Sequence, residues 1–343
     1  MQNRKPFRSV FAAMLVLMPT VALADPYFPP IEGKWETTSA ESANLRADNI
    51  QQALEFAESR ATSSLLIVHS GRIVSENHWK PEGENGQPTP RYRRTHKGDT
   101  TEGHPIEDVA SVQKSVISFL AGIAIGEGKL NLDKSASTYL GAGWSKASGA
   151  QEKVILIHHL MTMTTGLGNQ LQYQVTVGTR WRYNTAAYSQ MVPVLEKVFG
   201  ASIEDITRGR IAKPIGMANT SWMERPWAKN SDTANKVGLA TTARDLVRFG
   251  ILILSGGNWN ETPFLKDPDY LSESLSSSQS LNKSYGLLWW LNGQESYRAA
   301  AGAKQIMGSM TPSAPDDMIG AHSSEERRVG KECRARWSPV QLK

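Results

Sequence analysis

The sequence predicts an α/β (α+β) fold, in which helices flank an antiparallel sheet and a helical segment is inserted into it. Three observations predict this arrangement: two adjacent strand patterns near the start, a long and mainly helical stretch after them, and strand character again near the end. Such a chain buries the apolar face of its sheet against helices. We expect the sheet part at residues 44–130 and 270–322, and the helical part at residues 131–269.

The first sheet part begins with a helix and a strand pair. Residues 44–59 carry apolar side chains at helical spacing. Residues 64–69 and 72–79 have strand patterns, and the Ser-Gly pair between them predicts a hairpin turn. Residues 80–105 are rich in Gly, Pro, Thr and charge, which predicts a long loop.

A strongly apolar helix is predicted over residues 111–126, because its Val, Ile, Leu and Ala side chains keep helical spacing. Two further helices are predicted at residues 186–199 and 242–255, and a Thr pair can cap the start of the second. Residues 285–291 (Tyr-Gly-Leu-Leu-Trp-Trp-Leu) return to strand character.

The first 24 residues have the pattern of a secretory signal peptide. A cationic start precedes an apolar run over residues 10–22, and a small-x-small cleavage site ends at Ala24. The run is shorter than the roughly 20 residues that span a bilayer. We expect residues 1–24 to be removed, and the mature bacterial protein to be periplasmic or secreted, without stable insertion in a membrane.

The C-terminal tail, residues 323–343, shows no strand or helix period. It contains Ser-Glu-Glu-Arg-Arg-Val-Gly-Lys-Glu-Cys-Arg, which resembles the translation of a short-read sequencing adapter. We expect this tail to be non-native; a native, solvated basic tail is the alternative. The folded domain is then expected at residues 25–322.

The charge balance argues against a nucleic-acid partner. The chain has 38 basic and 33 acidic residues, a net charge of +5. Without the signal peptide and the tail, 29 basic and 30 acidic residues remain, so no basic excess is left to bind phosphates. The single cysteine, Cys333, lies in the tail. The mature domain is therefore expected to contain neither a disulfide nor a thiolate nucleophile.

Ser111 and Lys114 form a Ser-x-x-Lys pair at the start of the apolar helix. Positions i and i+3 share one helix face, so the hydroxyl and the amine can meet. A Ser hydroxyl needs a neighbouring base to act as a nucleophile, and a Lys whose pKa is depressed by burial can serve as that base. The pair predicts nucleophilic catalysis; an incidental pair on a surface helix is the alternative.

A second element, Trp-Arg-Tyr-Asn-Thr-Ala-Ala-Tyr, lies at residues 181–188. With these two elements in this order, the sequence resembles the β-lactamase-related serine hydrolases, which include class C β-lactamases, penicillin-binding DD-peptidases, family VIII esterases and nylon-oligomer hydrolases. The resemblance covers roughly residues 65–319 and implies a β-lactamase/DD-peptidase-like fold. Three further segments that carry it are residues 157–167, 213–217 and 242–250.

The resemblance implies roles for three more residues. Tyr183 would share a proton network with Ser111 and Lys114 and protonate the leaving group; a packed core aromatic is the alternative. Thr185 stands where the family often has Asn, and its hydroxyl can donate one hydrogen bond to the substrate. Trp290 is expected at the substrate, in Trp-rich segments that line an apolar cleft or pack in the core. These tryptophans are Trp181, Trp222, Trp227, Trp289 and Trp290.

The family's third motif, Lys-Thr-Gly or a relaxed His-x-Gly or Gly-x-x-Gly form, is not found. The nearest segments are residues 301–303 (Ala-Gly-Ala) and 321–323 (Ala-His-Ser), and neither fits well. We expect the domain to stop before this motif, so that its C-terminal strands and closing helix are missing. Losing one oxyanion donor in this way costs about 10²–10³ in rate, so this chain is expected to be inactive and its natural parent active.

The predicted function is a serine hydrolase that forms an acyl-enzyme with a small ester or amide. The alternatives are a β-lactamase or DD-peptidase acting on β-lactams or peptidoglycan, or a non-catalytic peptidoglycan-binding or sensor relative. A Ser-His-Asp hydrolase is disfavoured because Gly-x-Ser-x-Gly is absent. The seven histidines are scattered and no Gly-rich phosphate loop is present, so neither a metal site nor a cofactor is expected.

Overall fold

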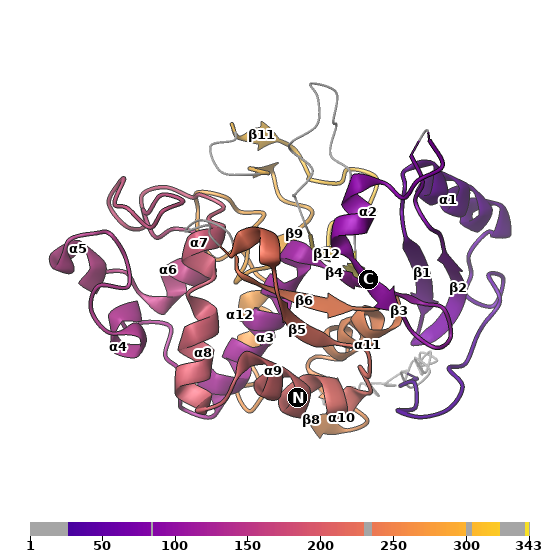
Figure 1. The fold of residues 1–343 in the computed structure, drawn as a ribbon, viewed down its shortest axis with the longest axis horizontal. Helices are drawn as coiled ribbons and strands as arrows, with labels where there is room; N and C mark the ends of the chain where they lie inside the picture. Colours follow the sequence, from indigo (N-terminus) through magenta and orange to yellow (C-terminus); the bar gives the residue numbers. More distant parts are fainter. Residues whose placement is uncertain (1–26, 84, 230–234, 300–303, 323–339, 343) are drawn as a thin grey trace, which may run out of the picture.

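The computed structural model places most of the expected domain (Figure 1). The expected signal peptide and most of the expected tail lie outside the described residues. Among the residues that are described, no helix is both long and apolar enough to cross a membrane. The described residues are 27–83, 85–229, 235–299, 304–322 and 340–342.

Twelve α-helices are assigned within the described residues, and most of them lie in the predicted helical part. They are α1 (Ala47–Ser59), α2 (Pro90–Thr95), α3 (Gln113–Gly126), α4 (Ala136–Leu140), α5 (Gly149–Lys153), α6 (Ile157–Met161), α7 (Thr185–Tyr188), α8 (Met191–Phe199), α9 (Ile203–Thr207), α10 (Lys213–Ile215), α11 (Ala243–Leu254) and α12 (Tyr270–Ser274). Short helical turns of other types are η1 (Ala110–Val112), η2 (Arg208–Ala212) and η3 (Pro226–Ala228).

The strands are short and all their pairings are antiparallel. They are β1 (Ser64–His69), β2 (Arg72–His78), β3 (His96–Asp99), β4 (Pro105–Asp108), β5 (Ser221–Glu224), β6 (Val237–Thr241), β7 (Asn258–Trp259), β8 (Thr262–Pro263), β9 (Trp290–Leu291), β10 (Ser296–Tyr297), β11 (Ile306–Met307), β12 (Ile319–Ala321) and β13 (Val340–Leu342).

A four-stranded sheet in the order β3-β4-β6-β5 lies at the centre of the molecule (Figure 1). Strands β4 and β6 pair although more than a hundred residues separate them in sequence, with Glu107 opposite Thr241. Helices α4 to α8 lie to one side of this sheet, and α1 with the β1–β2 hairpin lies to the other. The predicted antiparallel sheet with a helical insertion is therefore confirmed, and strands β5 and β6 already return to the sheet within residues 131–269.

The β1–β2 hairpin confirms the predicted strand pair and its turn. Ser70 and Gly71 both have positive φ, at 47° and 82°. Positive φ at both central residues is the mark of a type I′ turn, whose twist matches that of the flanking strands. The register places Ser64 opposite His78, and α11 packs against β1.

The loop predicted over residues 80–105 is wrong in part, because it contains α2 and β3. Thr89 accepts a hydrogen bond from the Tyr92 backbone and caps α2, with Pro90 at the first helical position. Strand β3 is a short, polar edge strand. Because it lacks apolar alternation, its strand character comes from pairing with β4 rather than from its own sequence.

Two other predicted elements are shorter than expected. The strand predicted at residues 285–291 is reduced to β9, since Leu288 has a φ of 66° that a strand cannot contain. The helix predicted at residues 186–199 is split into α7 and α8. The helix predicted at residues 242–255 is confirmed as α11, which Thr242 caps.

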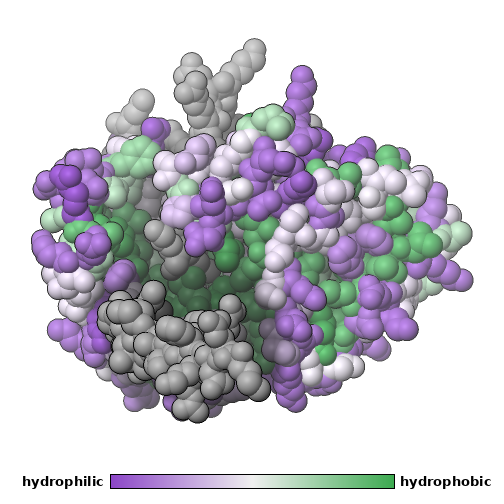
Figure 2. All heavy atoms as spheres, turned by 180° about the vertical axis from the view of Figure 1, so that it is seen from behind, coloured by the Kyte–Doolittle hydropathy of each residue, from purple (hydrophilic) through white to green (hydrophobic). Residues whose placement is uncertain are grey.

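Helix α3 runs through the core. Every residue from Gln113 to Ala124 is buried, and α3 packs against α8, α12 and β12. A helix that is apolar on all sides belongs inside a protein. On the face opposite to that of Figure 1, polar side chains cover most of the surface and apolar ones lie in a hollow (Figure 2). The burial of α3 places its first residues at the junction of the sheet and the helical part.

Candidate active site

Ser111 and Lys114 meet at the start of α3, as the sequence predicts. Ser111 lies in the short turn η1, and Lys114 lies in the first turn of α3. The Lys114 Nζ donates a hydrogen bond of 3.0 Å to the Ser111 Oγ. Both side chains are buried, with 9% of Ser111 and 3% of Lys114 exposed. This arrangement allows a proton to pass between the hydroxyl and the amine.

The backbone just before Ser111 is strained. Ala110 has a φ of 48°, which is unusual for a residue with a Cβ. Its N–H donates a hydrogen bond of 2.9 Å to the Asp108 Oδ1. Strain of this kind costs about 1–3 kcal/mol and gathers at functional sites. The turn therefore fixes where the Ser111 hydroxyl points.

Two tyrosines flank the Lys114 amine. Its Nζ lies 4.9 Å from the centroid of the Tyr183 ring and 4.5 Å from that of the Tyr188 ring. Tyr183 is partly buried, whereas Tyr188 is fully buried. Burial raises the pKa of the Tyr188 phenol above its ordinary value, so this phenol stays neutral. The sequence analysis found Tyr183 and missed Tyr188.

Gln113, inside the Ser-x-x-Lys segment, ties the start of α3 to β6. Its Oε1 accepts hydrogen bonds from the Leu239 backbone at 3.2 Å and from the Arg225 Nη2 at 3.0 Å. Its Nε2 donates to the Val237 carbonyl at 3.3 Å and to the Tyr188 hydroxyl at 3.4 Å. The buried amide therefore fixes α3 against the sheet and orients Tyr188 beside Lys114.

A buried ion pair supports this amide. Arg225 donates from Nε and Nη2 to the two carboxylate oxygens of Asp108, each at 2.6 Å. Only 3% of the Arg225 side chain and 8% of the Asp108 side chain are exposed. A two-point contact of this kind fixes both side chains in one geometry. It links Asp108, at the end of β4, to Arg225 at the residue after β5.

Thr185 and its neighbour Asn184 differ in their burial and in their contacts. Thr185 is the first residue of α7 and is partly buried. Asn184 caps α7 by accepting from the Ala187 backbone at 3.1 Å. Its Nδ2 also donates to the carbonyls of Leu167 and Gly168, at 2.9 and 3.0 Å. Asn184 is thus a structural residue, and the substrate role of Thr185 remains a prediction.

Trp290 belongs to a buried aromatic group behind Tyr183. The rings of Trp290 and Tyr183 are stacked with centroids 5.8 Å apart, and Tyr285 meets Trp290 edge-on at 4.9 Å. Trp181 lies 6.0 Å from Trp290. Trp289 packs instead on Phe249 in the core, and Trp227 is 49% exposed. The five predicted tryptophans therefore do not form one cleft. Trp290 packs against the ring of Tyr183.

The candidate segment at residues 321–323 begins at the end of β12. This strand pairs with β9 and packs against α3. His322 follows it directly and is buried, and burial lowers the pKa of its imidazole to about 4. The other candidate segment, residues 301–303, lies outside the described residues. In the tail, residues 340–342 pair with β12 as β13.

The residues that the sequence analysis missed had weak signals. Gln113 stands inside the motif, but a polar residue at that position is common on any helix. Asp108 and Arg225 are more than a hundred residues apart, and only the pairing of β4, β6 and β5 brings them together. Tyr188 was part of the quoted Trp181–Tyr188 segment, where its helical spacing from Asn184 indicates an inward position.

Comparisons with known proteins identify the family of the chain. The description "Beta-lactamase" belongs to the family model that matches residues 47–315. An uncharacterized protein of Alkalihalophilus pseudofirmus is 23% identical over 284 residues, which cover 76% of this chain and 80% of that protein.

Solved structures show the same fold at low identity. A putative 6-aminohexanoate-dimer hydrolase from Bacillus anthracis superposes with a TM-score of 0.59 at 16% identity, over 86% of this chain and 78% of that chain. A D-alanine carboxypeptidase from Burkholderia cenocepacia gives 0.56 at 19% identity, over 83% and 88%. The family model covers well over half of the sequence, and the chain therefore belongs to the β-lactamase family.

Proposed function

We propose that this protein is a serine hydrolase that cleaves a small ester or amide through an acyl-enzyme. The observation that carries the proposal is the 3.0 Å contact between the Lys114 Nζ and the Ser111 Oγ at the start of a buried helix. Similar structures support the class of reaction: one is a putative 6-aminohexanoate-dimer hydrolase, and another, EstCE1, is a hydrolase with promiscuous acyltransferase activity. No metal or cofactor is needed for this chemistry.

Lys114 takes the hydroxyl proton as Ser111 attacks the carbonyl carbon. Burial disfavours the ammonium form of Lys114, while the two tyrosine rings stabilise it. These opposing effects suit a group that must both gain and lose a proton. The N–H groups at the start of α3 face the negative charge that develops on the carbonyl oxygen.

Tyr183 completes the first half of the reaction. Its phenol protonates the leaving alcohol or amine, and the proton is replaced from Lys114. The carbonyl carbon is then bonded to the Ser111 Oγ. A water molecule attacks this ester, with the same groups moving the proton in the reverse direction, and the acid product leaves.

A covalent probe tests the nucleophile. The protein with its native C-terminus restored is treated with a fluorophosphonate, and the modified residue is identified by peptide mass spectrometry. We expect one adduct, on Ser111, and none in Ser111→Ala. The matched control is Ser115→Ala, since Ser115 lies one residue beyond Lys114 and donates to the Leu288 carbonyl at 3.1 Å. An adduct that persists in Ser111→Ala would exclude the proposed nucleophile.

Turnover assays test the substrate class. p-Nitrophenyl acetate, p-nitrophenyl butyrate and nitrocefin are compared on the given chain and on a version with the native C-terminus restored. We expect ester turnover in the restored protein, lowered about 10³-fold or more by Ser111→Ala. Faster turnover of nitrocefin would favour the β-lactam and peptidoglycan class instead, which the D-alanine carboxypeptidase relative represents. Labelling without any turnover would indicate a sensor relative.

A periplasmic or secreted location is part of the proposal and rests on residues 1–24. Expression in a Gram-negative host followed by fractionation tests it. We expect the mature protein in the periplasm or the medium, with Asp25 as its first residue by N-terminal sequencing. A full-length N-terminus retained in the cytoplasm would contradict this part of the proposal.

A further inference from the structure

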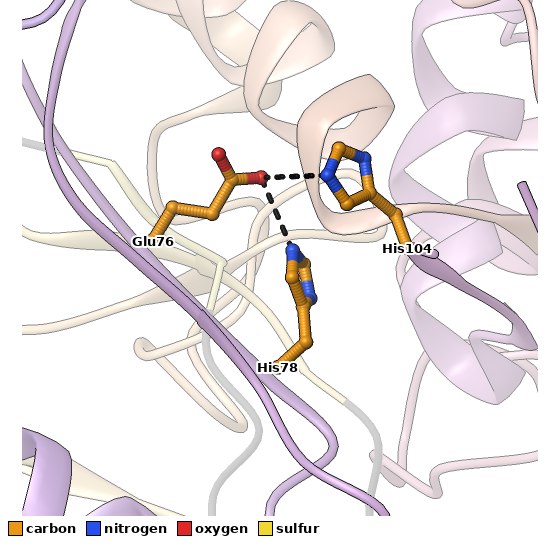
Figure 3. Close-up of side chains that lie close together, drawn as sticks. All are labelled: Glu76, His78 and His104. Atoms are coloured by element: carbon orange, nitrogen blue, oxygen red, sulfur yellow. Dashed lines mark hydrogen bonds and ion pairs between the residues drawn. The ribbon is translucent and has the colours of Figure 1, made fainter. Parts of the chain in front are cut away.

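Glu76, His78 and His104, none of which belongs to the Ser111 motif, point toward one another (Figure 3). Glu76 and His78 lie two residues apart on β2 and therefore on one face of that strand. His104 comes from the turn between β3 and β4. The facing ligand atoms of the three side chains all lie within 4.8 Å of one another.

The spacing fits a tetrahedral zinc site. Zinc binds nitrogen and oxygen at about 2.0–2.2 Å, so two of its tetrahedral ligand atoms lie about 3.3 Å apart. The His78 Nε2 lies 3.2 Å from the Glu76 Oε1, and the His104 Nε2 lies 3.9 Å from the same oxygen. Small side-chain movements would close the second distance. Two His and one Glu with a fourth position left for water form a known zinc ligand set.

The other ring nitrogen of each histidine has a polar side-chain oxygen nearby. The Ser64 Oγ lies 2.9 Å from the His78 Nδ1, and the Glu102 Oε2 lies 3.5 Å from the His104 Nδ1. A carboxylate beside Nδ1 holds the proton there and leaves the Nε2 lone pair for a metal. In that tautomer the His104 Nε2 lone pair faces a carboxylate oxygen, which is a repulsive contact that a cation between them relieves.

The net charge around the cluster favours the binding of a cation. Arg244 donates to both oxygens of Glu76 at 2.8 Å and to the Glu102 Oε2 at 3.2 Å. Two carboxylates and one guanidinium leave one negative charge when both imidazoles are neutral. The Glu76, His78 and His104 side chains are 14%, 20% and 13% exposed, so an ion can reach them from solvent.

We propose that Glu76, His78 and His104 bind a divalent transition-metal ion, with Zn²⁺ as the best match. Ser64 and Glu102 position the two imidazoles, and Arg244 positions the carboxylate. The ion joins the β1–β2 hairpin to the turn that leads into β4, a strand that ends three residues before Ser111. It thus stabilises the segment that leads into the candidate active site, and it takes no part in the reaction itself.

Metal binding to the untagged, metal-free full chain tests the proposal. Zn²⁺ is titrated in competition with a chromophoric chelator, and the retained metal is measured after gel filtration. We expect one Zn²⁺ per chain, a raised melting temperature, and no comparable effect of Mg²⁺, which prefers oxygen ligands. A wild-type chain that retains no zinc overturns the proposal.

Variants separate this site from adventitious binding. We expect His104→Asn to lose more than about 100-fold in zinc affinity, and Ser64→Ala, which keeps all three ligands, to lose about 10–100-fold. The matched control is His69→Asn, because His69 is an exposed histidine at the end of β1, and it should bind like the wild type. Equal losses in His104→Asn and His69→Asn would contradict the assignment.

A spectroscopic measurement covers the case in which His104→Asn does not fold. Co²⁺ in place of Zn²⁺ on the wild-type chain should give the intense visible absorption of a tetrahedral site with nitrogen ligands. The same spectrum is expected from Ser64→Ala at higher Co²⁺ concentration. A weak octahedral spectrum from the wild type would count against the site.

Discussion

At the scale of single residues, the candidate site separates two tyrosines that the sequence presents side by side. Both rings contact the Lys114 amine, but Tyr188 is fully buried and its hydroxyl accepts from Gln113. Burial also raises the pKa of the Tyr188 phenol. A group in that position holds Lys114 in place. The Tyr183 side chain is only partly buried, although its hydroxyl oxygen is covered, and Tyr183 is the tyrosine that we propose as the general acid.

The Tyr183→Phe substitution tests this division in the protein with its native C-terminus. We expect kcat for ester hydrolysis to fall about 10²–10⁴-fold, the usual contribution of a general acid. The melting temperature should change little, because the ring and its stacking on Trp290 are kept. Tyr173→Phe, at a tyrosine that is 41% exposed, is the control. An unchanged kcat in Tyr183→Phe would remove Tyr183 from the mechanism.

The Asp108–Arg225 pair gives a prediction about stability. Arg225→Met leaves the Asp108 carboxylate buried without its partner, which costs about 3–5 kcal/mol of unfolding free energy. The double variant Asp108→Leu with Arg225→Met should recover most of this loss, since no charge is then left buried. Urea denaturation measures both. A single variant as stable as the wild type would show that the pair is not isolated from solvent.

At the scale of elements, α3 combines a catalytic start with a tightly packed middle. A glycine in the interior of a helix normally lowers stability relative to alanine, so helix propensity alone predicts that Gly122→Ala would stabilise α3. The structure opposes this prediction, because a Cβ at Gly122 would lie 2.3 Å from ring atoms of Tyr270. Tyr270 is itself fully buried and donates to the Ser118 carbonyl at 2.7 Å, so it cannot move aside.

We therefore expect Gly122→Ala to destabilise the protein by about 1–3 kcal/mol through overpacking. Gly149→Ala is the matched control, because no atom lies within 4 Å of its added Cβ at the start of α5. That variant should be neutral or slightly stabilising. Thermal unfolding of both compares the two effects, and a stabilised Gly122→Ala would mean that α3 and α12 pack more loosely than described.

At the scale of the whole molecule, the partly buried histidine His159 makes stability depend on pH. Burial, with a smaller effect of His158, lowers the pKa of His159 from 6.5 to about 4. Its Nδ1 accepts from the Leu156 backbone at 3.0 Å and caps α6, which only the neutral ring can do. The unfolded chain therefore binds a proton more readily than the folded one. The stability contribution is complete above pH 6.5 and is lost as the pH falls toward 4.

We expect this loss to reach about 3 kcal/mol, since one pKa unit corresponds to about 1.4 kcal/mol. His159→Gln keeps a side-chain acceptor at the third helical position and removes the titrating group. Its unfolding free energy should change less between pH 7 and 4 than that of the wild type. His69→Gln, at an exposed position, should behave like the wild type. Parallel pH profiles for all three proteins would refute the role of His159.

Much of the fold was predictable because its signals are local. The β1–β2 hairpin follows from two strand patterns and a Ser-Gly turn, and α11 follows from its periodicity and Thr cap. Strand β3 was missed because its four polar residues have no strand pattern of their own. It exists because β4 supplies its hydrogen-bond partners. The predicted 285–291 strand is reduced to β9 for a different reason, since the positive φ of Leu288 interrupts it.

The sequence by itself determined the fold class and the meeting of Ser111 with Lys114. The fold class follows from local strand and helix patterns. The contact between Ser111 and Lys114 follows because residues three apart on a helix share a face, whatever surrounds the helix. Only the tertiary structure decided what encloses that pair. Asp108, Gln113 and Arg225 form one buried network because β4, β6 and β5 pair. The Glu76, His78 and His104 cluster needs β2 to lie beside the turn before β4, a long-range contact that no local pattern encodes.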